Sequence, residues 1–300
     1  MENTINTIVK CNSKLFGNNP SINRVNVGFT NAIYVINDMY IVKICIDRNN
    51  EENFKKEIEF YLANSDNDAI PKLYRFSTDK KEVGYYYEIM EKLTGVSLYN
   101  VWHTFSENER ENIISKLCKI IRQIHSNVGN SYDWKKKISD EFDMLYKKAK
   151  SLNLFNIEEQ KVIDLAYSKF SDYLDADKFV LIHNDLHFDN IFYKDGKIKL
   201  IDFERSVYAP KDFELDILYR MIRKPWKFAS EKTEEYTKLE DYENIMKYIE
   251  KYYPEIIYID NVYKRLAIYD VIYYLKQYIN NPSIIELKED VLNAAEIVLE

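Results

Sequence analysis

The 300-residue sequence predicts an α+β protein in which strands come first and helices follow. Three observations lead to this class. Short segments rich in Val, Ile and Tyr occupy much of the first ninety residues, and apolar residues recur at helical spacing after Leu93-Thr94-Gly95. The first region also runs as three strands, a helix and two strands, which is not the alternation of a doubly wound parallel sheet. We therefore expect a small strand-rich lobe over residues 1–92 and a larger helical lobe over residues 93–300.

Turn residues separate the expected strands of the first region. They lie at residues 28–31 and at Asn37-Asp38, on either side of the second strand. A helix is expected from about Glu51 to Asn64, between the third and the fourth strand. The five strands predicted in this way span residues 21–27, 32–36, 40–46, 72–77 and 83–91.

Capping signals mark two helix starts in the second region. Ser106 precedes Glu109 by three residues, and Asn156 stands in the same relation to Glu159. From Asp212 to the end of the chain, nearly the whole sequence is predicted to be helical. Leu266–Leu275 is apolar on every side, which predicts a buried helix.

One β segment, residues 179–203, interrupts this helical region. It contains two short apolar runs on either side of Lys194-Asp195-Gly196-Lys197, a turn suited to a hairpin.

Composition and charge exclude several classes of function. The chain carries 42 Lys and Arg against 49 Asp and Glu, a net charge of −7, which argues against binding nucleic-acid phosphates or an anionic membrane surface. The same balance is compatible with a cationic substrate. Cys11, Cys45 and Cys118 lie far apart, so neither a disulfide framework nor a thiolate zinc site is expected. No signal peptide or membrane-length apolar run is visible, and we expect a cytoplasmic protein.

Two motifs within residues 179–203 carry the chemistry. His183-Asn184-Asp185-Leu186-His187-Phe188-Asp189-Asn190 has the pattern H-x-D-x-x-x-x-N of the kinase catalytic loop. Leu200-Ile201-Asp202-Phe203-Glu204 stands where kinases carry D-F-G, with Glu204 in place of the glycine. Both motifs in this order, joined by a hairpin, are far less expected by chance than either alone.

In these motifs the sequence resembles the superfamily of aminoglycoside phosphotransferases and choline kinases. In layout the resemblance extends over essentially the whole chain. It implies a bilobal protein-kinase-like fold with a small antiparallel sheet in the first lobe. It also implies ATP or GTP as co-substrate, Mg²⁺ as cofactor and a small-molecule hydroxyl acceptor.

The chemistry of phosphoryl transfer explains the residue types of the two motifs, because it needs positioning and charge neutralisation more than covalent chemistry. A carboxylate must orient the acceptor hydroxyl and take its proton, and Asp185 fits this role. A carboxylate and an amide oxygen must hold Mg²⁺ against the nucleotide phosphates, and Asp202 and Asn190 fit.

The first lobe contains candidates for the groups that bind the nucleotide phosphates. Lys43, in the third expected strand, is placed like the kinase lysine that contacts the α- and β-phosphates. Glu57 falls on the following helix, where a glutamate pairs with that lysine, and Glu59 is the alternative partner. Gly28-Phe29-Thr30-Asn31 is the expected flap over the phosphates, although it has one glycine where kinases have G-x-G-x-x-G.

The base pocket is expected where the first lobe ends. By resemblance, Met90 gates the adenine pocket, and the backbone at Glu91 and Leu93 reads the edge of the base. The sequence leaves the choice between ATP and GTP open, and the oligomeric state as well.

The spacing after the second motif favours a small acceptor over a protein. About ten residues separate Asp202 from the helical texture at Asp212, and Ala209-Pro210-Lys211 lacks the acidic residue of A-P-E, so a long activation segment has no room. Asp216 resembles the family's structural aspartate, which implies a supporting role. The resemblance makes an aminoglycoside the leading acceptor, and with it antibiotic resistance.

Two alternatives to this function remain. The residues Ile201-Asp202-Phe203-Glu204 resemble choline and ethanolamine kinases more than the usual D-F-G of resistance enzymes. A non-catalytic nucleotide-binding module of kinase-like fold is the second alternative. A kinase that has lost its activity would be expected to lack at least one of the key residues. All of them are present here: Lys43, Asp185, Asn190 and Asp202.

Two charged segments have open roles in acceptor binding. The acidic run from Glu231 to Glu243, which includes Glu234, is interpreted as a solvated helix face rather than a contact to a cationic sugar. A basic cluster lies just upstream and keeps anionic or neutral acceptors open; it consists of Arg220, Arg223, Lys224 and Lys227.

Asp270 lies inside the apolar stretch Leu266–Leu275. A buried carboxylate needs a partner, since burial without one is costly or shifts the pKa. Pairing with Arg265 or a lysine is favoured over contact with an amine of the substrate.

Overall fold

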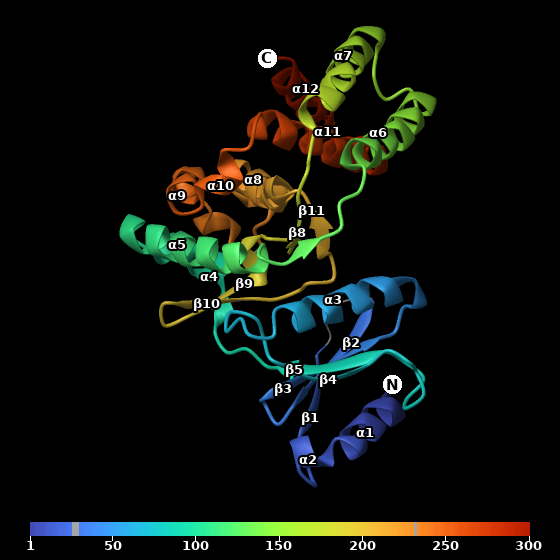
Figure 1. Cartoon of the computed structure of the whole chain (residues 1–300), viewed down its shortest axis with the longest axis vertical. Helices are drawn as coiled ribbons and strands as arrows, with labels where there is room; N and C mark the ends of the chain where they lie inside the picture. Colours follow the sequence, from blue (N-terminus) through green and yellow to red (C-terminus); the bar gives the residue numbers. More distant parts are fainter. Residues whose placement is uncertain (26–29, 231–232) are drawn as a thin grey trace. The chain divides into compact units, whose positions relative to one another are not determined.

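The computed structural model describes residues 1–25, 30–230 and 233–300 (Figure 1). By their contacts these residues form two compact units, one made of residues 1–124 and 185–207, the other of residues 125–184 and 208–300. The chain thus leaves the first unit after residue 124 and returns to it at Asp185, within the first motif. The predicted lobe boundary at residue 92 stays a prediction. None of the described helices is both long enough and apolar enough to cross a membrane.

An antiparallel five-stranded sheet lies in the first unit, which confirms the α+β prediction (Figure 1). Its order is β1-β2-β3-β5-β4. The turn between β2 and β3 spans residues 37–39, and Asn37 and Asp38 enter it with φ of 53° and 55°. The last strand is shorter than predicted, because turns and bends occupy residues 81–85. The strands are β1 (Ile22–Val25), β2 (Asn31–Ile36), β3 (Tyr40–Cys45), β4 (Leu73–Ser77) and β5 (Tyr87–Glu91).

The two faces of this sheet differ. One face packs in an apolar core against α1 (Glu2–Cys11) and α2 (Ser13–Phe16), two helices that the sequence prediction missed. Val42 and Ile44 belong to that core. Because side chains alternate along a strand, Lys43 points to the opposite face, where α3 (Glu51–Ala63) lies.

A second, smaller sheet of the first unit carries the predicted hairpin. Its order is β10-β9-β6, and Asp195 and Gly196 form the turn with φ of 48° and 77°. Helix α5 contacts β10 and begins with the predicted capping box, in which Ser106 N donates to Glu109 Oε2 at 2.8 Å. The elements are β6 (Val96–Ser97), α4 (Leu98–Val101), α5 (Glu107–Ile124), β9 (Ile191–Lys194) and β10 (Lys197–Leu200).

The second unit is largely helical around a short three-stranded sheet, β11-β8-β7. Its strands are β7 (Val128–Gly129), β8 (Phe179–Ile182) and β11 (Val207–Ala209). The single β segment expected over residues 179–203 therefore supplies strands to two different sheets.

Helix α11 is the central helix of the second unit and contacts α6, α7, α8 and α12 (Figure 1). Leu266–Leu275 within it is almost entirely buried, which confirms the prediction. The Asn156–Glu159 capping box at the start of α7 is also confirmed. The helices are α6 (Trp134–Ser151), α7 (Ile157–Tyr173), α8 (Leu215–Arg223), α9 (Ile245–Tyr252), α10 (Pro254–Ile257), α11 (Val262–Asn280) and α12 (Ile285–Leu299).

Short 3₁₀ helices complete the described chain. They span Arg48–Asn50, Trp102–Thr104, Phe188–Asn190, Lys211–Glu214, Pro225–Lys227, Glu234–Tyr236 and Leu239–Asp241.

Candidate active site

Lys43 on β3 and Glu57 on α3 form a buried ion pair in the first unit. Lys43 Nζ lies 2.6 Å from Glu57 Oε2, and the two residues are 8% and 1% exposed. The alternative partner, Glu59, is exposed to solvent. The structure therefore brings together the lysine and the glutamate that the sequence singles out, while their role toward phosphates stays a prediction.

The charges around Lys43 shift the pKa values of this pair. Burial lowers the pKa of the Lys43 ammonium, but the carboxylates of Glu57, Glu88 and Glu204 outweigh burial and raise the pKa above its usual range. Burial raises the pKa of Glu57 to about 7, against the lowering effect of Lys43. Lys43 therefore remains a cation over the physiological pH range.

Glu204 is a further member of the site that the sequence prediction did not assign. Its carboxylate lies 2.5 Å from Lys43 Nζ and accepts hydrogen bonds from Asn31 Nδ2 at 2.5 Å and Asn50 Nδ2 at 3.0 Å. The signal for it was present in the sequence, because a carboxylate replaces the glycine of D-F-G two residues after Asp202.

The catalytic-loop motif places Asp185 and Asn190 together. Asn190 Nδ2 donates to the backbone carbonyl of Asp185 at 2.9 Å and lies 3.4 Å from Asp185 Oδ2. Arg205 Nη1 lies 3.4 Å from Asp185 Oδ1. The Asp185 carboxylate is thus held by the loop and by a neighbouring cation, and its side chain remains 12% exposed.

Asn190 lies beside Ile201, the residue that precedes Asp202. The backbone N–H of Ile201 donates to the carbonyl of Asn190 at 3.0 Å. Since Asn190 Nδ2 is used by the Asp185 carbonyl, its Oδ1 is the atom that can ligate a cation. Oxygen ligands of this kind suit Mg²⁺, which binds few protein groups and completes its shell with phosphates and water. No group of three or more His, Cys, Asp or Glu side chains suited to a metal occurs within the described residues.

Phe203 fixes the second motif to helix α3. Its buried ring stacks on Phe60 with the centroids 4.1 Å apart and meets Tyr61 edge-on at 5.2 Å. The helix that presents Glu57 thus also anchors the segment that presents Asp202 and Glu204.

A cavity of about 580 Å³ in the first unit connects the phosphate candidates with the base candidates. This volume is in the range of cofactor sites. Predicted site residues are prominent among its lining: Thr30, Asn31, Lys43, Glu57, Met90, Glu91, Leu93 and Asp202. Gly28 and Phe29 of the expected flap lie outside the described residues.

Strand β5 carries the expected gate, Met90, and Glu91 of the expected base-reading backbone. Tyr61 Oη donates to the sulfur of Met90 at 3.3 Å, which ties the expected gate to α3. The Glu91 N–H donates to the Lys72 carbonyl at 2.8 Å, so we expect a base to be read by the Glu91 carbonyl and by Leu93.

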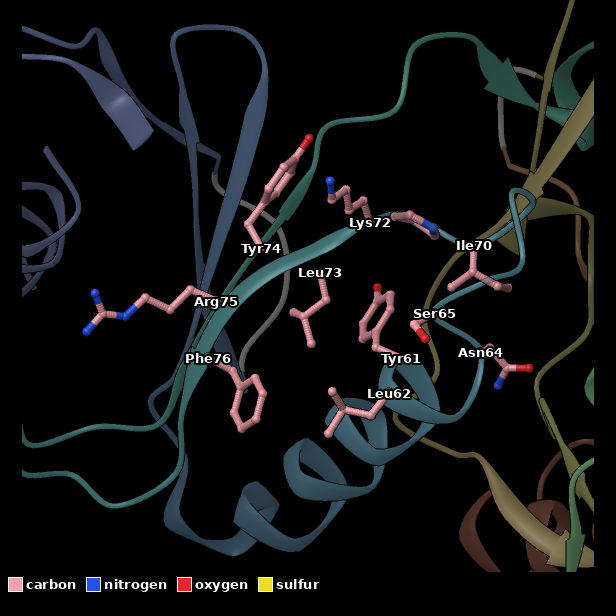
Figure 2. Close-up of a pocket in the computed structure, with 11 residues that line it drawn as sticks. Tyr61, Leu62, Asn64, Ser65, Ile70, Lys72, Leu73, Tyr74, Arg75 and Phe76 are labelled. Carbon is pink, nitrogen blue, oxygen red and sulfur yellow. The ribbon is translucent and has the colours of Figure 1, made fainter. Parts of the chain in front are cut away.

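A separate cavity of about 410 Å³ lies between α3 and β4 (Figure 2). Tyr61 lines both cavities, but neither Lys43 nor Asp202 lines this one. Figure 2 shows Leu62 and Leu73 facing the space, while Arg75 points away from it. We therefore take the larger of these two cavities as the candidate site.

In the second unit, Glu214 holds the start of the catalytic loop. Its carboxylate accepts hydrogen bonds from the backbone N–H of His183 at 2.8 Å and of Asn184 at 3.1 Å, and His125 Nε2 lies 3.2 Å away. Asp216, which the sequence suggested for support, pairs instead with Arg220 on α8.

All four residues of the basic cluster form ion pairs within the second unit. Arg220 lies 3.2 Å from Asp270, and Arg223 also pairs with Asp270. Lys224 and Lys227 both pair with Glu286 of α12, each at 3.0 Å. The cluster therefore has intramolecular partners at all four positions.

The predicted pairing of Asp270 with Arg265 is wrong. Arg265 pairs with Asp212 at 2.8 Å, while Asp270 pairs with the two arginines of α8. Residues five positions apart on a helix lie on different faces, so Asp270 and Arg265 point to different neighbours.

The acidic run lies on short 3₁₀ helices rather than on a continuous helix face. Glu234, Glu235, Glu240 and Glu243 are exposed, and Glu231 lies outside the described residues. The interpretation of a solvated segment agrees with this exposure.

Comparisons with known proteins agree with this geometry. The model of the APH family, described as a phosphotransferase enzyme family, matches residues 21–247. No match is found among curated proteins.

Three similar solved structures are aminoglycoside phosphotransferases. ADP-bound APH(2'')-Ib is 18% identical, with a TM-score of 0.69 over 97% of this chain and 98% of that chain. The streptomycin–ATP ternary complex of APH(2'')-IIa is 18% identical, with a TM-score of 0.66 over 97% of both chains. The GDP and kanamycin complex of APH(2'')-IIIa is 15% identical, with a TM-score of 0.66 over 100% of this chain and 99% of that chain. These likenesses show a shared kinase-like fold.

Proposed function

The chain belongs to the APH family of phosphotransferases, and from this premise we propose that it transfers the γ-phosphoryl group of ATP or GTP to a hydroxyl of a small molecule. One observation carries the proposal. The Lys43–Glu57 pair and Asp202 line a single cavity that also contains Met90 and Leu93. The residues that we propose for phosphate binding and those that we propose for base binding thus occur in one unit.

In the proposed reaction, Asp185 orients the acceptor hydroxyl and takes its proton, which is worth roughly 10²–10⁴ in rate. Lys43 compensates charge on the nucleotide phosphates and is positioned by Glu57. Asn190 Oδ1 and the Asp202 carboxylate are the groups that would hold Mg²⁺. Bound there, Mg²⁺ would neutralise charge on the transferring phosphate.

We propose an aminoglycoside as the acceptor, with antibiotic resistance as the consequence and the cytoplasm as the location. The structural relatives include complexes with streptomycin and kanamycin. The net charge of −7 suits a cationic acceptor. The ion pairs of the basic cluster remove the main argument for an anionic acceptor, since Arg220, Arg223, Lys224 and Lys227 are matched by carboxylates.

A choline or ethanolamine kinase is the second candidate, because Glu204 both follows the Asp202-Phe203 pair and participates in the site. A binding module that transfers nothing is the third.

One assay distinguishes the three functions. The purified chain is incubated with ATP or GTP and Mg²⁺ and, in turn, with kanamycin, streptomycin, choline and ethanolamine, and products are identified by mass spectrometry. A phosphorylated antibiotic supports the first function, and phosphocholine or phosphoethanolamine the second. Nucleotide binding without any product supports the third, and absence of nucleotide binding would contradict all three.

A further inference from the structure

Glu204 occupies the place on Lys43 where a nucleotide phosphate is expected. Its Oε1 lies 2.5 Å from Lys43 Nζ, and both carboxylate oxygens accept hydrogen bonds, from Asn31 and from Asn50. The side chain lines the same cavity as Lys43 and Asp202. A phosphate that binds Lys43 must therefore lie beside this carboxylate or displace it.

The backbone that carries Glu204 has little freedom to withdraw. The preceding residue, Phe203, is 0% exposed and stacks on Phe60 of α3. Rotation of the side chain can change the contact with Lys43, but a negative charge remains in this part of the cavity.

The surroundings of Lys43 contain an excess of carboxyl groups. Glu57 lies 2.6 Å from Lys43 Nζ, and Glu88 and Asp202 also act on it electrostatically. Glu88 is 0% exposed, and neither of its carboxyl oxygens has a hydrogen-bond partner among the described residues. Burial raises the pKa of Glu88 well above its usual value. Glu88 therefore keeps its proton and adds no charge, and the negative charge beside Lys43 comes from Glu204 and Asp202 together with Glu57. A metal-free triphosphate would add to this negative charge, whereas its magnesium complex brings a compensating cation.

We infer that Glu204 makes nucleotide binding depend on a divalent cation, because its carboxylate repels the metal-free nucleotide at the position of Lys43. Glu204 is in this way a specificity-determining residue that distinguishes the magnesium complex from the free nucleotide. The inference rests on the proposed function, since it takes the 580 Å³ cavity as the nucleotide site.

Equilibrium binding of a fluorescent ATP analogue, in Mg²⁺ and in EDTA, tests this inference without measuring turnover. In Glu204→Gln we expect the metal-free analogue to bind roughly tenfold more tightly than in the wild type, since one nearby negative charge is removed. Glu59→Gln is the matched control, because it removes the same charge from an exposed position on α3. It should behave like the wild type.

Adenosine provides a second measurement that needs no variant. It has no phosphates, so its affinity for the wild type should be the same in Mg²⁺ and in EDTA, while that of ATP should differ. An equal metal dependence for adenosine and ATP would overturn the inference.

The remaining outcomes separate the inference from the proposed function. The inference is overturned if Glu204→Gln and the wild type show the same ratio of dissociation constants with and without Mg²⁺. If the wild type binds no ATP or GTP analogue in either condition, the proposed function is what fails. Glu204→Ala is measured in the same way if thermal unfolding shows that Glu204→Gln does not fold.

Discussion

Around Asp270 in the second unit, two arginines meet two carboxylates. Arg220 pairs with Asp216 and Asp270, and Arg223 pairs with Asp270 as well. Burial raises the pKa of Asp270, but the two arginines counteract this effect and provide its partners. The charges of this network therefore balance within the chain.

Around Lys43 in the first unit, one ammonium meets several carboxyl groups. Glu57 and Glu204 contact it, and Glu88 lies nearby without a hydrogen-bond partner among the residues that the structure describes. Glu88 keeps its proton, but Glu57 and Glu204 share one ammonium with Asp202 close by, so the charges here do not balance within the chain.

The difference indicates which of the two clusters is a site. A balanced buried network needs no ligand, and removal of one member leaves an uncompensated charge that destabilises the fold. An unbalanced cluster that lines a cavity gains from a ligand that brings the missing cation, and shifted pKa values are common at such places. From this comparison we propose that the charges around Lys43 serve the reaction and that those around Asp270 stabilise the fold.

The largest effect should follow from Asp185→Asn. We expect turnover to fall by about 10²–10⁴-fold, because the proton acceptor is lost while the size of the side chain is kept. Melting temperature and nucleotide affinity should stay close to those of the wild type. Phosphoryl transfer at the wild-type rate would contradict the role of Asp185 and with it the functional half of the comparison.

Asp270→Ala should act on stability instead. We expect the free energy of unfolding to fall by about 3–5 kcal/mol, because Arg220 is left buried without one of its carboxylates. Urea denaturation measures this change. Glu243→Ala, which removes an exposed carboxylate of the same unit, is the control. If Asp270→Ala lowered the free energy of unfolding by less than about 1 kcal/mol, the proposed role of this network in stabilising the fold would be contradicted.

Glu88→Gln should change the pH dependence of stability. Burial raises the pKa of Glu88 above its usual 4.5, so the folded wild type keeps a proton that the unfolded chain releases. Stability from this group is present at low pH and is lost as the pH rises above about 4.5, by at most about 1.4 kcal/mol per pH unit. Urea denaturation between pH 5 and pH 8 should therefore show the wild type losing stability relative to Glu88→Gln. If the free energy of unfolding of the wild type and of Glu88→Gln changed with pH in the same way, a raised pKa of Glu88 would be contradicted.

Lys227→Ala should have the smallest effect. Its partner Glu286 is half exposed, and exposed ion pairs contribute about 0–1 kcal/mol. Thermal unfolding should change by a few degrees at most. Since the basic cluster is matched by carboxylates, we also expect unchanged KM for the acceptor, and a large change in KM would return this cluster to acceptor binding.

Local patterns predicted much of the fold. Asn37-Asp38 and Asp195-Gly196 marked hairpin turns, Asn156 and Glu159 marked a helix start, and the structure has these features where expected. Each depends on residues a few positions apart, whose geometry the backbone settles locally. The motif residues could be predicted for the same reason, because Asp185 and Asn190 lie a few positions apart in one loop.

Contacts between distant segments could not be predicted in this way. Helix α1 joins the core only because the sheet offers its apolar face, which the N-terminal sequence does not reveal. Glu214 and Asp216 both stand near the start of α8, and only the folded chain shows which one reaches the catalytic loop. The partner of Asp270 depends likewise on which helix packs beside α11.

The sequence by itself determined the order of strands and helices, the two motifs and the chemical types of their side chains, because these follow from short-range periodicity and spacing. The tertiary structure alone decided that Glu204 shares Lys43 with Glu57 and that the basic cluster is neutralised. It also decided that Glu88 is buried with no hydrogen-bond partner in the part of the chain that the structure describes. Electrostatic energies depend on distance and burial in three dimensions, and a linear sequence specifies neither until the chain has packed.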